Sequence, residues 1–340
     1  MPSNPVFENV TVYDLPHKFT RPLVIEAKRA DERLSDWVKH NLASIDAVLL
    51  ERGAILFRGF QTTTPEVLEQ AVSHITPELV NYVEGSSPRF KVTEKVYTST
   101  EYPPEFAISL HNELSYAHQW PSKLYFLCLK PADGGGETPL ADSREVFKLL
   151  SPALRERFLE KGVRYVRNLH GGRGVGLSWQ AIFETSDRED VERYCQEGNI
   201  AYEWTRKGGL RTSQTRPSAI KHPRTGEKIW FNQVDQWHPS NLPEANRKSM
   251  LALLKEADLP INAYYGDGSA LEIEALEEIR MVVDQVSIKI PWQEKDVLLL
   301  DNMLVAHGRC AYSGSRKVVL AMGGLVRLDE VETLHKEAEL

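Results

Sequence analysis

The sequence predicts a mainly β protein, a double-stranded β-helix (jelly roll) with flanking helices and a large insertion or lid. Short apolar segments with strand character recur between residues 54 and 326, and helical patterns precede them and lie among them. A polar stretch rich in Gly, Arg and Ser, at about 167–224, separates the earlier strands from the later ones. No G-x-G-x-x-G opens a helix after a strand, so a dinucleotide-binding fold has no support. We expect residues 1–340 to form a single domain with its core at about 50–326.

The N-terminal part of the chain carries two helical patterns with a strand between them. Apolar residues recur at helical spacing over 35–51, and the run 54–57 that follows is typical of a short buried strand. Thr64 directly precedes Pro65, which is the order expected for an N-cap and the first residue of a second helix.

The remaining elements are mostly strands. The apolar, aromatic segment 122–129 predicts a buried strand, and the glycines at 134–136 predict a turn before a second strand at 137–141. Ser143 begins a predicted helix that ends near Ser151. Further strands are expected at 228–232, 286–290, 296–300 and 317–326.

Composition excludes several classes of protein. The net charge is -7 and the basic residues are scattered among acidic ones, which argues against nucleic-acid binding. No stretch reaches the ~18 apolar residues of a membrane-spanning helix, and the first residues lack the pattern of a secretion signal. The three cysteines form neither a disulfide framework nor a zinc-type pair. We therefore expect a cytoplasmic protein.

A possible metal site begins with His111 and Glu113. Side chains two residues apart on an extended segment point to the same side, so both groups can face one metal ion. His307 follows a predicted buried strand and precedes a glycine, which makes it a candidate third ligand. Two imidazoles and one carboxylate leave open coordination positions, an arrangement suited to non-haem iron(II).

An anionic co-substrate at such a metal would need a cation. Arg316 lies nine residues after His307, and its planar guanidinium can bind a carboxylate through two parallel hydrogen bonds. Each residue also has an ordinary alternative. A lone H-x-E is a weak signal, His307 could be a core or surface histidine, and Arg316 could be a solvated turn residue.

Several blocks, in order along the chain, resemble one known family. They are residues 53–60, 96–103, 111–113, 121–126, 134–142 and 296–307, followed by Arg316. With these blocks the chain resembles the taurine dioxygenase (TauD/TfdA)-type iron(II)/2-oxoglutarate oxygenases, in their clavaminate-synthase-like branch.

The resemblance implies a role for each matching residue. His111, Glu113 and His307 would bind iron(II) and form the catalytic centre, while Thr138 and Arg316 would bind 2-oxoglutarate, the co-substrate that is consumed with O2. The spacing from His307 to Arg316 is short for the family, so Arg309 is the alternative. Many relatives carry aspartate at the second ligand position. Glutamate is found there in the clavaminate-synthase-like amino-acid hydroxylases, and Glu113 argues against halogenation.

The resemblance also implies the reaction. We expect hydroxylation of an unactivated C–H bond in a free amino acid or a carrier-tethered aminoacyl group of specialised metabolism. Alternatives are oxidation of a sulfonate or another small acid, desaturation or cyclisation by the same chemistry, and a jelly-roll binding protein with a vestigial metal site. Four arginines of the central stretch are candidates for binding a substrate carboxylate: Arg167, Arg173, Arg211 and Arg216.

Overall fold

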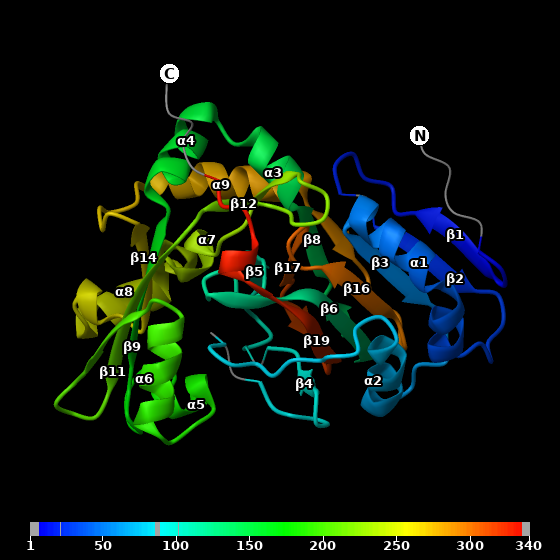
Figure 1. Cartoon of the computed structure of the whole chain (residues 1–340), viewed down its shortest axis with the longest axis horizontal. Helices are drawn as coiled ribbons and strands as arrows, with labels where there is room; N and C mark the ends of the chain where they lie inside the picture. The colour runs from blue at the N-terminus through cyan, green and yellow to red at the C-terminus, as the bar shows by residue number, and fades with distance from the viewer. Residues whose placement is uncertain (1–6, 21, 86–88, 101, 335–340) are drawn as a thin grey trace.

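Two β-sheets form the centre of the molecule (Figure 1). The computed structural model describes residues 7–20, 22–85, 89–100 and 102–334. The predicted mainly β architecture with flanking helices is confirmed. The large sheet has the order β1 (Val10–Asp14), β2 (Leu23–Ala27), β3 (Ala54–Arg58), β16 (Val297–Asp301), β6 (Gln119–Lys130), β19 (Lys317–Arg327), β4 (Val96–Thr98). The small sheet has the order β15 (Ile288–Ile290), β8 (Thr138–Asp142), β17 (Val305–Arg309), β5 (Ile108–His111).

Both faces of the large sheet are covered by other parts of the protein. This explains why the sequence of strand β16 is a continuous apolar run. Leu298 and Leu300 pack into the core cluster that also contains Leu140 of the small sheet. Val297 and Leu299 point the other way and pack into a second cluster that contains residues of two helices. A strand buried on both faces gains from apolar residues at every position, not only at alternate ones.

The helices behind the large sheet are α1 (Leu34–Arg52) and α2 (Pro65–Ser73) (Figure 1). α1 ends at Gly53, which has a φ of 73° and donates its N–H to the carbonyl of Leu49. α2 begins as predicted, because the Thr64 hydroxyl accepts a hydrogen bond from the N–H of Val67.

The central polar stretch is more regular than its composition indicated. It contributes the end of β9 (Val163–Leu169) and all of β10 (Ala201–Trp204) and β11 (Leu210–Arg216) to a sheet of order β10-β11-β9-β14, with β14 (Ile261–Tyr265) at one edge. In Figure 1 this sheet lies on the opposite side of the molecule from α1. Burial alternates along β11, but its buried positions include Thr212, Gln214 and Arg216. A search for apolar periodicity therefore could not find this strand.

One predicted strand is wrong in part. Val286 ends α9 (Ile273–Val286), and the strand β15 begins only at Ile288. The buried residues of α9 include Leu276, Ile279 and Val282. These residues are three positions apart, which is a spacing typical of a helix. The helix continues to Val286, the first residue of the predicted strand.

The other helices and strands connect these layers. They are β7 (Gly134–Gly135), α3 (Ser143–Leu149), α4 (Pro152–Lys161), α5 (Trp179–Phe183), α6 (Arg188–Glu197), β12 (Ala219–Lys221), β13 (Lys228–Trp230), α7 (Val234–Trp237), η1 (Pro239–Asn241), α8 (Glu244–Leu253), η2 (Glu256–Asp258), β18 (Tyr312–Ser313) and η3 (Leu328–Glu330). Among the residues that the structure describes, no helix has both the length and the apolar character required to span a membrane.

Candidate metal centre

Two neighbouring strands of the small sheet bring His111 and His307 together. His111 is the last residue of β5, and the antiparallel register pairs it directly with His307 in the middle of β17. Residues that face each other across antiparallel strands have adjacent side chains, and the centroids of the two imidazole rings are 4.5 Å apart. Gly308 permits this approach, since a Cβ there would lie 2.5 Å from the carbonyl oxygen of Ile108.

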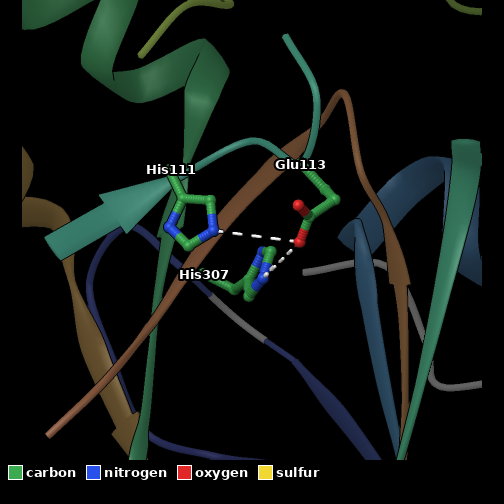
Figure 2. Close-up of side chains that lie close together, drawn as sticks. All are labelled: His111, Glu113 and His307. Atoms are coloured by element: carbon green, nitrogen blue, oxygen red, sulfur yellow. Dashed lines mark ion pairs between the residues drawn. The ribbon is translucent and has the colours of Figure 1, made fainter. Parts of the chain in front are cut away.

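Glu113 completes the group from the turn that follows β5. Its Oε2 lies 3.9 Å from Nε2 of His111 and 3.8 Å from Nε2 of His307 (Figure 2). All three side chains are buried or nearly so, and their ligand atoms lie within 4.8 Å of one another. The local conformation differs from the predicted extended segment, because Glu113 already belongs to a turn in which Leu114 has a φ of 58°. The two side chains nevertheless converge.

Both histidines are held in the neutral form that a metal ligand requires. Burial lowers the pKa of His111, and burial together with the nearby His111 and Arg89 lowers the pKa of His307 well below its usual range. Nδ1 of His111 lies 2.9 Å from the carbonyl oxygen of Ser109, which can only accept a hydrogen bond. The side-chain amide of Gln236 also lies 3.3 Å from Nδ1. The tautomer with its proton on Nδ1 donates to Ser109 and leaves the lone pair of Nε2 facing Glu113.

The geometry and donor set fit a first-row metal ion. Two ligand atoms at roughly 2.1 Å from one ion, as for zinc, lie about 3.0 Å apart at right angles and about 4.2 Å apart on opposite sides. The separations of 3.8 and 3.9 Å lie between these values, so a small inward shift of the side chains brings all three to adjacent positions around one ion. Two neutral imidazoles and one carboxylate on one side of an ion leave coordination positions free for other ligands, as in non-haem iron(II) sites. His111, Glu113 and His307 could hold such an ion.

A narrow cavity beside the histidines contains the two residues expected to bind 2-oxoglutarate. Thr138 and Arg316 both line it, together with His111, His307 and Phe126. The Nε of Arg316 donates to the carbonyl of Gly136 at 3.1 Å, and its Nη1 lies 3.5 Å from the Ser99 hydroxyl. Burial and the nearby Arg309 lower the pKa of Arg316 to about 10, so it is a cation at neutral pH. Within the described residues its hydrogen-bond partners are neutral oxygens, which leaves it available to an anion.

The comparison with known proteins agrees with this geometry. A family model described as "Taurine catabolism dioxygenase TauD, TfdA family" matches residues 12–322. The chain belongs to the TauD/TfdA family. Membership makes it an oxidoreductase, a dioxygenase that uses iron(II), 2-oxoglutarate and O2.

Two relatives and one solved structure are similar to the chain over most of its length. The dapdiamide synthesis protein DdaC of Enterobacter agglomerans is 38% identical over 310 residues, which cover 89% of this chain and 93% of DdaC. A clavaminate synthase-like protein of Arabidopsis thaliana is 30% identical over 288 residues, covering 82% and 83%. The crystal structure of PvcB from Pseudomonas aeruginosa matches with a TM-score of 0.58 at 15% identity, covering 98% of this chain and 97% of PvcB. The predicted jelly-roll fold and clavaminate-synthase-like branch are confirmed.

Asn302 joins the two segments that carry the metal-binding side chains of this TauD/TfdA protein. It lies in the turn between β16 and β17, fully buried. Its Oδ1 accepts the N–H of Glu113 at 2.7 Å, and its Nδ2 donates to the Glu113 carbonyl at 2.9 Å. In return, Asn112 donates to the Asn302 carbonyl at 2.6 Å. The sequence offered one signal that was not used, because a polar residue inside the apolar run 297–306 must find buried hydrogen-bond partners.

Arg89 was also missed. Its Nη2 donates to Oε2 of Glu113 at 2.6 Å, and its side chain is 3% exposed. No feature of the sequence around residue 89 distinguishes this arginine from the many exposed ones, so only the fold reveals it.

The arginines that the sequence singled out behave differently from Arg316. Arg309 donates to the carbonyls of Tyr102, Pro103 and Phe106, so it holds the backbone that precedes β5. Of the four central arginines, Arg173 and Arg211 are exposed, whereas Arg167 and Arg216 are buried and donate to backbone carbonyls. None of the four is among the described residues that line the cavities next to His111.

A larger cavity of about 470 Å³ adjoins the narrow one, since Thr100, Ile108 and His111 line both. Gln236 and Trp237 of α7 line it. Apart from His111, the described residues of its wall are uncharged: Thr100, Tyr102, Phe106, Ala107, Ile108, Ser109, Gln236, Trp237, Asn241, Leu242, Pro243 and Ile261. A small organic molecule can therefore reach the metal ligands from this side.

Proposed function

We propose that the protein hydroxylates an unactivated C–H bond of an amino acid or of a carrier-tethered aminoacyl group in specialised metabolism. In this proposal His111, Glu113 and His307 bind iron(II), and Thr138 and Arg316 bind the distal carboxylate of 2-oxoglutarate. The observation that supports it most is the convergence of three buried ligand side chains beside a cavity that contains Arg316 and Thr138.

The proposal takes residues 1–340 as one oxygenase domain in the cytoplasm, with its core at about 50–326. The segment 167–224 would be an insertion beside the substrate cavity. One contact supports this placement, because the guanidinium of Arg167 stacks on the ring of Trp237, which lines that cavity.

The side chains of the co-substrate cavity suit a dicarboxylate. When iron(II) is bound, it supplies oxygen activation and the oxidative decarboxylation of 2-oxoglutarate. Arg316 offers a planar pair of N–H donors to the distal carboxylate. Thr138 accepts a hydrogen bond at 3.0 Å from Nε1 of Trp292. Because its oxygen is already engaged as an acceptor, its hydroxyl hydrogen is directed to another partner, and a carboxylate is such a partner. The ring of Phe126, whose centroid lies 5.2 Å from that of His307, adds an apolar surface to the wall of this cavity.

The uncharged wall of the larger cavity supports an aminoacyl substrate over a sulfonate. A buried sulfonate or free carboxylate needs a cationic partner, and the described residues of this wall include no Lys or Arg, so within the proposal the wall favours a carrier-tethered aminoacyl group over a free amino acid. An aminoacyl thioester has no free carboxylate, and the amide and hydroxyl groups of Gln236, Asn241 and Ser109 can hydrogen-bond to it. The similarity to DdaC, which is named for dapdiamide synthesis, supports a role in specialised metabolism.

The test begins with the metal-free protein under anaerobic conditions. Addition of iron(II) and then 2-oxoglutarate should produce the weak visible charge-transfer band of the chelate, and His111→Ala and Arg316→Ala proteins should lose most of it. Succinate release is then measured with free amino acids, aminoacyl pantetheine thioesters and taurine. Release that depends on the thioesters or the amino acids supports the proposal. Release with taurine alone would replace it by a sulfonate oxygenase, and a wild-type protein without the band would refute the ligand assignment.

Product analysis separates hydroxylation from the alternatives that use the same oxidant. A product 16 mass units heavier than the substrate corresponds to hydroxylation. A loss of 2 mass units would instead identify desaturation or cyclisation.

A further inference from the structure

Arg89 is a buried cation whose hydrogen-bonding capacity is only partly used. One of its nitrogens, Nη2, donates to Oε2 of Glu113 at 2.6 Å and lies 3.5 Å from the hydroxyl of Thr100. Its guanidinium carbon lies 4.2 Å from the ring centroid of Tyr82, and this stacking fixes the plane of the group. Its Nε and Nη1 are buried and, within the described part of the chain, have no hydrogen-bond partner.

Unpartnered N–H groups on a buried guanidinium indicate a missing ligand when the group lines a cavity, as Arg89 does. Arg167 also has an unpartnered Nε and Nη1 among the described residues, but it lines none of the cavities beside His111. Arginine remains charged even when it is buried, so it cannot avoid the cost by losing its proton. Leaving buried donors of a charged group unpaired costs considerably more than leaving them in water. Native proteins keep few such groups, and those that occur at a cavity are candidates for ligand binding. The missing partner of Arg89 should therefore be an acceptor, and a carboxylate is the acceptor that best fits a guanidinium.

The position of Arg89 identifies which ligand this is. Arg89 lines the narrow cavity that also contains Thr138 and Arg316, and it is not among the residues that line the larger, adjoining cavity. Arg316 contacts the hydroxyl of Ser99, and Arg89 contacts the hydroxyl of the next residue, Thr100. The two arginines therefore contact neighbouring residues of the wall of this cavity. Arg89 is next to the metal-binding carboxylate of Glu113, whereas the contacts of Arg316 are to Gly136 and Ser99. Two arginines in one small cavity suit a ligand with two carboxylates.

We propose that Arg89 is a second carboxylate-binding arginine, which binds the carboxylate of 2-oxoglutarate adjacent to its keto group, while Arg316 and Thr138 bind the distal one. Nη2 continues to orient Glu113, and Nε and Nη1 bind the ligand. The inference rests on the ligand assignment of the preceding section, but it is independent of the substrate class proposed there.

The test uses two ligands that differ at one end. 2-Oxopentanoate has the carboxylate and keto group of 2-oxoglutarate but lacks the distal carboxylate. Dissociation constants for both are measured anaerobically on the iron(II)-saturated protein from the charge-transfer band, and on the Mn(II)-saturated protein by calorimetry. Arg89→Gln should weaken both ligands by the same factor, about 10–100-fold. Arg316→Gln should weaken 2-oxoglutarate by a similar factor and leave 2-oxopentanoate unchanged.

Metal saturation and folding are controlled separately. Metal affinity is titrated first for each variant, because Arg89 also contacts Glu113, and circular dichroism checks the fold. Arg89→Lys is the milder variant; it keeps the charge and should recover part of the affinity for both ligands. Equal binding of both ligands by wild-type and Arg89→Gln proteins would overturn the inference. So would a loss confined to 2-oxoglutarate, since that would place Arg89 at the distal carboxylate. A wild-type protein that binds neither ligand would overturn this inference together with the ligand assignment.

Discussion

Two buried arginine–carboxylate pairs of the molecule, Arg58–Asp296 and Arg89–Glu113, differ in how completely their hydrogen bonds are satisfied. Arg58 of β3 forms two hydrogen bonds with Asp296, at 3.0 and 2.7 Å, and a third with the carbonyl of Pro291 at 3.2 Å. Asp296 also accepts the N–H of Gln293 at 2.8 Å. Arg89 instead makes one hydrogen bond to Glu113 at 2.6 Å, and two of its nitrogens lack partners among the described residues.

This difference separates a structural pair from a functional one. The first pair ties the end of β3 to the residue before β16, which are neighbours in the large sheet, and nothing remains for a ligand to satisfy. The second lies in a cavity beside two histidines and has unused donors. A buried charge whose bonds are complete stabilises one arrangement of the backbone. A buried charge in a cavity whose hydrogen bonds are incomplete is able to bind a ligand.

The largest expected effect is on stability, and it concerns the pair of Arg58 and Asp296. Arg58→Met leaves Asp296 buried without its cation and should lower the free energy of unfolding by about 3–5 kcal/mol. Arg89→Gln, measured with saturating Mn(II) so that Glu113 keeps a cation beside it, should cost about 1 kcal/mol or less. Urea unfolding of both variants checks this. Equal losses would erase the distinction between the two pairs.

The next effect is on metal affinity. His307→Ala removes one of three proposed ligands and should weaken Mn(II) binding by at least about 100-fold, or roughly 3 kcal/mol. His238→Ala is the matched control, because that histidine is also partly buried but contacts Ser240 and does not line the cavities beside His111. Electron paramagnetic resonance of free Mn(II) reports both affinities. Metal binding by His307→Ala at wild-type strength would show that the ion is held elsewhere.

A smaller loss of metal affinity is expected at Asn302. Asn302→Leu keeps the side-chain size but removes the hydrogen bonds to the N–H and carbonyl of Glu113. Mn(II) affinity should fall by about 10–100-fold, as is typical for residues that orient metal ligands. Asn302→Asp retains the acceptor for the Glu113 N–H and should lose less. If both variants unfold at the wild-type urea concentration and bind Mn(II) normally, Asn302 has no orienting role.

The smallest predicted effect concerns Trp292. Trp292→Phe removes the donor to Thr138 and should weaken 2-oxoglutarate binding by about 3–10-fold, the range of one neutral hydrogen bond. Binding of 2-oxopentanoate should not change, because that ligand has no distal carboxylate for Thr138 to bind. A loss that is equal for both ligands would indicate a general disturbance of the cavity, not an effect through Thr138.

Local patterns were sufficient to predict the elements and part of the site. Apolar spacing found α1 and its strand neighbour β3, and the order Thr64–Pro65 found the start of α2. His111 and Glu113 could be predicted as ligands of one metal because they are two positions apart, which is one period of an extended strand. His307 and Arg316 were located mainly by resemblance to a family, since their distance in sequence from His111 conceals their proximity. Polar strands such as β11 were not found, because the buried residues were not apolar.

The sequence by itself determined which residues are buried in the principal strands and helices, and which side chains were candidates for a metal. These depend on patterns a few residues long. Only the tertiary structure decided that Arg89 contacts Glu113, and that Asn302, 189 residues further along the chain, binds the backbone of Glu113. It also decided that Arg309 donates to backbone carbonyls while Arg316 lines the cavity. The physical reason is that a buried polar group takes whatever partner the fold brings within hydrogen-bond distance. That partner is set by strand order and register, and no local pattern records it.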